Sequence, residues 1–329
     1  MKNSFEKQTA VMRPFEDGCR VAFYGDSITR NGEGITRTAA YYRTMFPEQK
    51  IRFFNAGISG GTVPAAHIFF GDLLEPVRPT HVVLAFGVND AGSAIITSGT
   101  NDIEAEKRRS DEAVARFESE YERLIDCIRE IGAAVVLRTP TPNDDRASGP
   151  DIPQFGRGAA HRRIADCVRN IAQKRSLPLV DDYASLSARL ECGDDLFNND
   201  RLHPNERGQW LLSEDFLHAQ GLTTGIFRPF SDVVSEAGLA DWHESAVNLT
   251  FIPSTEWLLM QGEALSLDEK LARVKKWLDG NEGKEGVNPA IVRFARGYLR
   301  SKPREAELRA WEESLAINSF AFKPQEHKQ

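Results

Sequence analysis

Five short apolar runs alternate with longer amphipathic segments in the first two-thirds of the chain. The runs are rich in β-branched or aromatic residues and are bounded by turn-forming residues, as buried strands are. They cover Val21–Tyr24, Ile51–Asn55, His81–Phe86, Ala133–Arg138 and Leu177–Val180. Because helical segments separate them, the pattern predicts a parallel sheet with helices on both faces. Ligands of such sheets bind at the carboxyl ends of the strands, so we expect the chemistry at that edge.

Three segments in the same part of the chain have the spacing of amphipathic helices. The clearest is Asp111–Ile131, whose apolar residues recur every three or four positions and which Ser110 is placed to cap. The second covers about 159–174. The third begins near Asn205 and ends before Gly221.

From about residue 223 the strand pattern stops and only helical signals remain. A capping box at 266–269, an Asn-Pro pair at 288–289 and a proline at 303 each mark a helix start. We therefore expect an α/β domain over residues 1–222 and an all-helical extension over 223–329. The extension carries large aromatic residues that are costly to leave in water, namely Trp242, Trp257, Trp277 and Trp311. We expect it to dock on the first domain and to contribute to a homo-oligomer interface.

The composition is that of an ordinary globular protein with a mild negative charge. The 329 residues include 41 Lys and Arg against 48 Asp and Glu, a formal charge of −7. This balance, with no basic stripe, argues against nucleic acid or an anionic membrane as the partner. No apolar signal segment or membrane span is evident, so we expect a cytoplasmic protein. The four cysteines, which form no Cys-x-x-Cys pair, are expected to be buried, reduced thiols.

Candidate chemistry begins directly after the first apolar run, at Gly25–Ile28 (Gly-Asp-Ser-Ile). Ser27 there would stand at the carboxyl edge of the sheet, with its backbone N–H directed toward a reacting oxygen. The alternative is that Ser27 merely caps the next helix.

Two further blocks follow the second and third runs. Residues 55–62 are rich in glycine and other small side chains, which let the backbone approach a ligand closely, although a plain turn has the same composition. The block Gly87–Asp90 contains Asn89, whose carboxamide can donate to a developing negative charge. Asn89 could equally cap a helix.

The fourth block, Asp200–Asn205, follows the fifth run and contains His203. An acid three residues before a histidine can hold one ring nitrogen and leave the other free to act as a base. The Pro-Asn pair that follows then starts a helix, which constrains the turn.

The four blocks together, in this order, resemble those of the SGNH/GDSL hydrolase superfamily over about residues 12–220. The resemblance implies a flavodoxin-like three-layer α/β/α fold and ester hydrolysis without a metal or cofactor. It makes Ser27 the nucleophile, His203 the general acid/base and Asp200 its partner. The oxyanion hole would consist of the Ser27 and Gly60 backbone N–H groups and the Asn89 side chain. Asp26 and Arg30 are candidate substrate-binding residues.

A rival interpretation uses Gly57–Gly61, which matches the Gly-x-Ser-x-Gly nucleophile elbow of α/β-hydrolases and would make Ser59 the nucleophile. It leaves the first and third blocks without a role. A departure from the resembled family also stands out: many of its carbohydrate-acting members have an acid where this chain has Arg30. With Arg37 and Arg43 nearby, we consider both a basic loop facing a negatively charged or polyhydroxylated substrate and a solvated loop.

The expected activity is hydrolysis of short acyl esters, above all acetyl esters of a carbohydrate or small polar alcohol. A lipid or thioester hydrolase with the same triad is the alternative enzyme. A binding module with a relic site is a different class, against which the intact blocks argue. A nucleotide-binding domain is disfavoured because no Gly-x-Gly-x-x-Gly or Walker A motif follows the first run. We expect residues 223–329 to supply no catalytic group.

Overall fold

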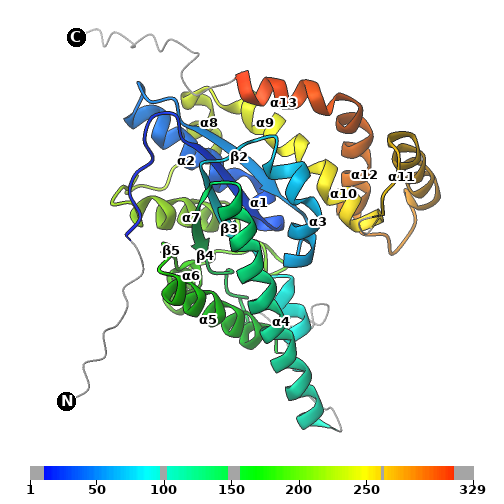
Figure 1. The fold of residues 1–329 in the computed structure, drawn as a ribbon, viewed down its shortest axis with the longest axis horizontal. Coiled ribbons are helices and arrows are strands. Elements are labelled where there is room, and N and C mark those ends of the chain that lie inside the picture. Colours follow the sequence, from blue (N-terminus) through cyan, green and yellow to red (C-terminus); the bar gives the residue numbers. More distant parts are fainter. Residues whose placement is uncertain (1–10, 97–101, 147–155, 261–262, 315–329) are drawn as a thin grey trace.

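The computed structural model describes residues 11–96, 102–146, 156–260 and 263–314 (Figure 1). Five strands form one parallel sheet in the order β2-β1-β3-β4-β5, which is the flavodoxin-like order. The strands are β1 (Arg20–Gly25), β2 (Arg52–Gly57), β3 (His81–Ala85), β4 (Ala134–Arg138) and β5 (Leu179–Val180). Each lies within two residues of a predicted run, so the predicted α/β fold is confirmed.

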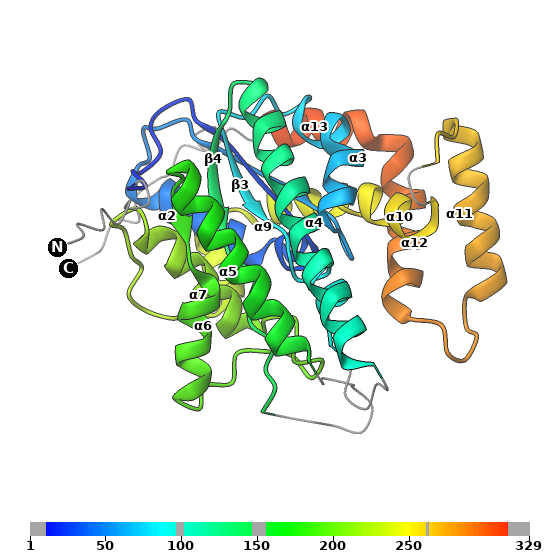
Figure 2. The ribbon, with the colours of Figure 1, turned by 60° about the horizontal axis from the view of Figure 1, so that its bottom comes forward.

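Alternate residues of each strand enter two different cores, because successive side chains of a strand point to opposite faces. Ala22 and Tyr24 of β1 pack in the core beneath α3, α4 and α5, whereas Val21 and Phe23 pack beneath α2, α7 and α9. Figure 2 shows α4 and α5 on the near side of the sheet. The helices of this part of the chain are α1 (Ser27–Asn31), α2 (Glu33–Met45), α3 (Val63–Leu74), α4 (Ile103–Glu130), α5 (Arg157–Arg175), α6 (Asp182–Glu191) and α7 (Glu206–His218).

Helix α4 is longer at its N-terminus than the apolar spacing predicts. It begins at Ile103, and Asp102 caps it by accepting the N–H of Ala105. The predicted cap, Ser110, lies inside the helix, buried, and donates to the carbonyl of Ala94. The pattern missed the first two turns because they are mostly charged and, as Figure 1 shows, extend beyond the body of the domain.

The C-terminal region contains six α-helices within the described residues, where the sequence signals marked only three. Helices α11, α12 and α13 follow the three expected starts, whereas α8, α9 and α10 had no recognised signal. The six are α8 (Phe230–Ala237), α9 (Ala240–Leu249), α10 (Phe251–Met260), α11 (Leu267–Asn281), α12 (Pro289–Ser301) and α13 (Glu305–Ser314). Helix α10 was missed because nearly all of its first two turns is buried, which leaves no polar face to give a helical period.

The C-terminal region packs in two ways. Leu239 and Trp242 join the core on one face of the sheet, so α8 and α9 are continuous with the α/β domain. Beyond them, α10, α11 and α12 enclose a separate core that includes Val274 and Tyr298, seen beside α3 in Figure 1. The predicted docking on the first domain is therefore observed. The domain boundary at residue 222 and the homo-oligomer stay predictions, and the side chain of Trp311 lies outside the described residues.

Two further expectations concern the burial of the cysteines and the absence of a membrane-spanning helix. All four cysteines are free, and Cys167 is buried as expected. Cys19 and Cys127 are only partly buried, and the expectation is wrong for Cys192, which is exposed. It lies at the end of α6, where the apolar face of the helix has already turned away from it. In the described part of the chain, none of the helices has the length and apolar character needed to cross a bilayer.

Candidate active site

The first three sequence blocks meet because their strands end in register. Gly25 of β1 pairs with Gly57 of β2 on one side and with Ala85 of β3 on the other. Gly57 also permits a close approach of the two blocks: a Cβ atom there would lie 2.3 Å from the backbone nitrogen of Arg30. The segments after β1, β2 and β3 therefore leave the sheet side by side, at its carboxyl edge.

Ser27 is the first residue of α1, and its side chain does not cap that helix. The cap is Asp26, whose carboxylate accepts the N–H of Ile28 at 2.9 Å. The Ser27 hydroxyl instead lies 2.8 Å from Nε2 of His203, a residue 176 positions away in the chain. The structure therefore rules out the simple capping role for Ser27.

The other ring nitrogen of His203 contacts Asp200. Nδ1 lies 2.6 Å from Oδ2 of the carboxylate, and the backbone N–H of His203 donates to Oδ1 at 2.9 Å. Partial burial alone would raise the pKa of Asp200, but these hydrogen bonds from His203 and the N–H of Leu202 bring it below its usual value. Asp200 is thus held ionised and orients the imidazole by both its ring and its backbone.

The tight turn that carries this pair has an unusual backbone conformation at its centre. Arg201 has a φ of +58°, a left-handed conformation that is uncommon for a residue with a side chain. Its carbonyl accepts the N–H of Asp144, and its guanidinium contacts the carboxylates of Asp144 and Asp195. These contacts hold the turn in the form that places Asp200 below the imidazole of His203.

Asn89 and the glycine-rich loop after β2 are bonded to each other. The Asn89 amide donates one N–H to the carbonyl of Gly61 at 2.8 Å. Because the amide group is planar, this bond also fixes the orientation of its second N–H. Although Asn89 precedes a short 3-10 helix, Asp90–Ala94, its side chain makes no capping bond. Next to it, the Asp90 carboxylate accepts the N–H of Val63 at 3.0 Å. These two bonds join the second and third sequence blocks.

Two buried carboxyl groups lie beneath the site. Burial raises the pKa of Asp26 from 3.8 to about 7, and the nearby charge of Asp90 adds to the increase. Burial likewise raises the pKa of Asp90 to about 7. Asp26 is only 1% exposed, so its side chain offers a substrate almost no surface. Its observed contact is the cap of α1, while the substrate-binding role expected for it remains a prediction.

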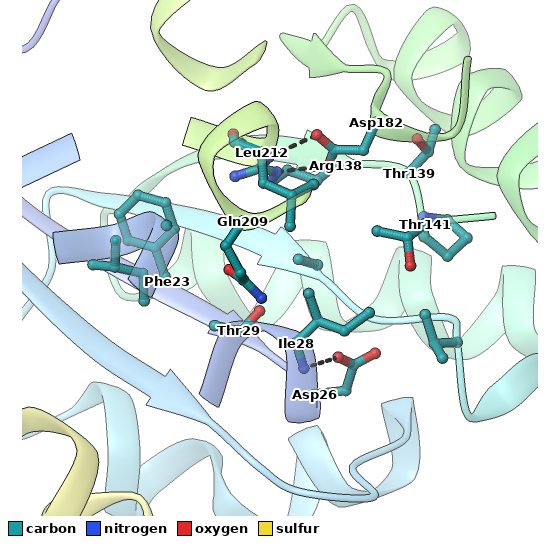
Figure 3. A pocket seen from close by; sticks show the side chains of 15 residues that line it. Phe23, Asp26, Ile28, Thr29, Arg138, Thr139, Thr141, Asp182, Gln209 and Leu212 are labelled. Carbon is teal, nitrogen blue, oxygen red and sulfur yellow. Dashed lines mark hydrogen bonds and ion pairs between the residues drawn. The ribbon is translucent and has the colours of Figure 1, made fainter. Parts of the chain in front are cut away.

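A small pocket of about 50 Å³, with a mainly apolar lining, lies beside α1. Figure 3 shows Asp26 and Thr29 on one side of it and the buried ion pair of Arg138 with Asp182 on another. The volume holds one or two water molecules and no substrate. A larger groove of about 1060 Å³ runs along α2, α7 and α8, but neither Ser27 nor His203 lines it.

Ser59, the nucleophile of the rival elbow interpretation, is buried. It is 5% exposed, and its backbone N–H donates to Oγ of Ser254 at 2.8 Å. No hydrogen bond joins Ser59 to His203 among those of the described residues. The geometry around Ser27 therefore fits a nucleophile, and that around Ser59 does not.

The three arginines after Ser27 lie on α1 and α2, so neither of the two loops considered from the sequence, the basic one and the solvated one, is observed. Arg37 is buried and forms an ion pair with Glu33, because α2 packs that face inward. Arg43 lines the large groove rather than the site. Arg30 points toward the C-terminal region, and its contacts there leave its predicted substrate role untested.

The guanidinium of Arg30 lies against two neighbouring aromatic rings. Its central carbon is 4.7 Å from the ring centroid of Phe251 and 4.8 Å from that of Phe294, and Nε donates to Oγ1 of Thr250. Burial lowers the pKa of Arg30 to about 10, and the positive charge of Arg293 adds to the decrease. A cation in this setting ties α1 to the helices that follow residue 250.

Two residues of the C-terminal region touch the glycine-rich loop, and no sequence signal pointed to them. Ser254 accepts the N–H of Ser59, and Trp257 donates its indole N–H to the carbonyl of Gly60 at 2.9 Å. Both lie on α10, whose sequence shows only an apolar run. Within the described residues, no cluster of three or more His, Cys, Asp or Glu side chains suits a metal ion.

Comparison with known proteins agrees with this arrangement. Residues 23–211 match the GDSL-like lipase/acylhydrolase family, a span that contains Ser27, Gly60, Asn89, Asp200 and His203. The chain belongs to this family. It is therefore a carboxylic ester hydrolase.

Three similar proteins show how much of the chain the similarity covers. An acetylxylan esterase of Geobacillus stearothermophilus is 24% identical over 226 residues, which cover 62% of this chain and 94% of the esterase. A solved structure of a catalytic mutant of an acetylxylan esterase from that organism has a TM-score of 0.53 and 21% identity, covering 66% of this chain and 100% of its own. The structure of a gut microbial diltiazem-metabolizing enzyme has a TM-score of 0.63 and 18% identity, and the match covers 94% of this chain and 95% of that enzyme. The fold with its helical C-terminal region thus has a solved counterpart.

Proposed function

We propose that this protein hydrolyses short-chain acyl esters, acetyl esters of a carbohydrate or small polar alcohol above all, with Ser27 as the nucleophile. The observation that carries the proposal is the hydrogen-bonded chain from Ser27 through His203 to Asp200, with distances of 2.8 and 2.6 Å. A serine, a base and an acid that orients the base are the parts that acyl transfer requires.

In the first step His203 accepts the proton of the Ser27 hydroxyl at Nε2 while Oγ attacks the ester carbonyl. Asp200, bonded to Nδ1, keeps the ring in the tautomer whose Nε2 is free to accept and stabilises the imidazolium that forms. The tetrahedral oxyanion accepts hydrogen bonds from the backbone N–H groups of Ser27 and Gly60 and from the amide of Asn89. His203 then protonates the leaving alcohol.

In the second step a water molecule takes the place of the alcohol. His203 removes its proton as it attacks the acyl-enzyme, and the same three donors stabilise the second oxyanion. Collapse of this intermediate returns the proton to Ser27 and releases the acid.

The preference for a small acyl group has two supports. The first is that the similarity to the acetylxylan esterase covers 94% of that enzyme. The second is the openness of the site: the side chains of His203 and Asp200 are 39% and 48% exposed. An open site suits a short acyl chain on a polar alcohol better than a long chain that must be enclosed.

The test of the nucleophile compares Ser27→Ala with Ser59→Ala on p-nitrophenyl acetate. We expect Ser27→Ala to lower kcat by roughly 10⁴-fold or more and to abolish labelling by a fluorophosphonate, because the attacking oxygen is gone. Ser59→Ala, the matched control, should stay within about tenfold of the native rate. The reverse result would support the elbow interpretation.

Acyl length is tested on the native enzyme with p-nitrophenyl acetate, octanoate and palmitate. We expect kcat/KM to be highest for the acetate. A maximum at octanoate or palmitate would favour the lipid or thioester hydrolase instead.

A further inference from the structure

Helix α10 contacts the loop that carries Gly60 at two peptide groups, one on each side of the peptide that joins Ser59 to Gly60. Ser254 accepts the N–H of Ser59 at 2.8 Å, and Trp257 donates its indole N–H to the carbonyl of Gly60 at 2.9 Å. Ser254 is completely buried and Ser59 nearly so. The two bonds connect segments about 195 residues apart in the chain. Ser254 and Trp257 lie outside the family's four sequence blocks.

The position of these bonds relative to the Gly60 N–H determines their effect. That N–H belongs to the peptide between Ser59 and Gly60. The peptide before it is held through the Ser59 N–H, and the peptide after it through the Gly60 carbonyl. With both neighbouring peptide planes held, the plane between them has little freedom to rotate, because each peptide is itself rigid. The direction of the Gly60 N–H is therefore set from both sides.

Such fixing matters at this residue because Gly60 has a φ of +69°. Gly61 donates its N–H to the carbonyl of Ile58 at 2.9 Å and so closes a turn around Ser59 and Gly60. That bond holds the ends of the turn, but the central peptide, which carries the Gly60 N–H, points in opposite directions in different turn types, and a glycine changes between them at little cost. The side of the loop away from α10 is held separately, where Asn89 donates to the carbonyl of Gly61.

Helix α10 is itself anchored on the side away from the loop. Thr255 donates to the carbonyl of Phe294 on α12 at 3.0 Å. The buried Glu256 accepts a hydrogen bond from Tyr298 of α12 at 2.9 Å and pairs with Lys270 of α11 at 2.8 Å. The loop is thus attached to a helix that the neighbouring helices hold in place.

We propose that Trp257 is a positioning residue of the esterase, which aims the Gly60 N–H at the oxyanion through its hydrogen bond to the Gly60 carbonyl, with Ser254 as the second attachment point. The proposal rests on the proposed function, since it assigns Gly60 to the oxyanion hole. It gives the C-terminal region a part in the reaction without placing a reacting group there.

The decisive variant is Trp257→Phe, which removes the indole N–H and keeps an aromatic ring in the same place. We expect kcat on p-nitrophenyl acetate to fall on the order of tenfold, with KM within about twofold, because the oxyanion forms only after binding. The inhibition constant of phenylboronic acid, whose tetrahedral adduct with Ser27 resembles the intermediate, should rise by the same factor. A loss of packing alone would not couple these two quantities.

The matched control is Trp277→Phe, on α11. Trp277 packs in the core of α10–α12 and is half-buried, as Trp257 is, but lies on a helix with no hydrogen bond to the loop in the described structure. We expect its kcat and its inhibition constant to stay native. If both variants lose kcat equally, or if Trp257→Phe keeps the native kcat and boronate affinity, the proposal is overturned.

Ser254→Ala is the second variant and removes the other attachment. We expect a several-fold loss of kcat with unchanged KM. If Trp257→Phe fails to fold, this variant decides alone, and a native kcat would overturn the proposal. Failure of the proposed function would give a different result, because Ser27→Ala would then remain active. If Ser27→Ala is inactive but the α10 variants keep the native kcat, only the positioning role of Trp257 is overturned.

Discussion

The carboxyl edge of the sheet and the helical region after residue 222 differ in how far their contacts at the candidate site can be recognised from the sequence. At the sheet edge, Asp200 and His203 are three residues apart, and the other groups follow directly on their strands. In the helical region, Ser254 and Trp257 reach loop residues about 195 positions earlier in the chain. The contact of Ser27 with His203 also spans 176 positions, but each of these two residues lies in a short motif. Ser254 and Trp257 lie in none.

The comparison teaches that contacts to the candidate site extend beyond the recognisable motifs. The family match ends at residue 211, and the acetylxylan esterase structure covers two-thirds of this chain. The side chains of Trp257 and Ser254 nevertheless contact the loop of Gly60. In this protein, a helix outside the matched span contacts a loop inside it, to which we assign an oxyanion donor.

The largest effect expected from a variant of the sheet edge, after loss of the nucleophile, is that of Asn89→Ala. It removes one of the proposed oxyanion donors and the bond to Gly61, so kcat should fall about 10²–10³-fold with little change in KM. The measurement is steady-state kinetics on p-nitrophenyl acetate. If Asn89→Ala lowers kcat no more than Trp257→Phe does, the sheet edge does not contribute more to the rate than the helical region, which would contradict this prediction.

Arg30→Met tests the junction between the two regions. It removes the contacts of the guanidinium with Phe251, Phe294 and Thr250, so the free energy of unfolding in urea should fall by about 1–2 kcal/mol while KM stays native. Arg116→Met, on an exposed position of α4, is the control and should be near neutral. A several-fold rise of KM without loss of stability would instead restore the substrate-binding role that the sequence suggested for Arg30.

The smallest effect concerns the buried carboxyl of Asp26. Its pKa is about 7 in the folded protein and near 3.8 when exposed, so the folded state binds the proton more tightly. The native protein therefore loses stability from this group as the pH rises from about 4 to about 7. Asp26→Asn keeps an oxygen that can accept the N–H of Ile28 but cannot ionise.

We accordingly expect the Tm of Asp26→Asn, relative to native, to be a few degrees higher at pH 8 than at pH 5, as measured by circular dichroism. Asp232→Asn, at an exposed position of α8, should show the same difference at both pH values. An Asp26→Asn difference that does not change with pH would contradict the penalty of burying this carboxylate.

Much of the sheet was predictable because its strands are short, apolar and uniformly buried. The runs that precede Ser27 and Asn89 form β1 and β3, and their parallel pairing brings the ends of these strands together. His203 lies in the segment between α6 and α7. The start of α4 was missed because its first turns bury little. Helix α10 was missed for the opposite reason, since burial on nearly all sides removes the periodicity by which a helix is recognised.

The sequence by itself determined which elements form and which residue types stand at their ends, because both depend on neighbours within a few positions. Hydrophobic period, capping and turn residues act over that range, and so did the Asp200–His203 pair. Only the tertiary structure decided that Arg30 turns away from the sheet edge toward Phe251 and Phe294, and that Trp257 bonds the Gly60 carbonyl. Contacts of this kind depend on how whole helices pack, and packing is selected by shape and buried area summed over many residues rather than by any short pattern.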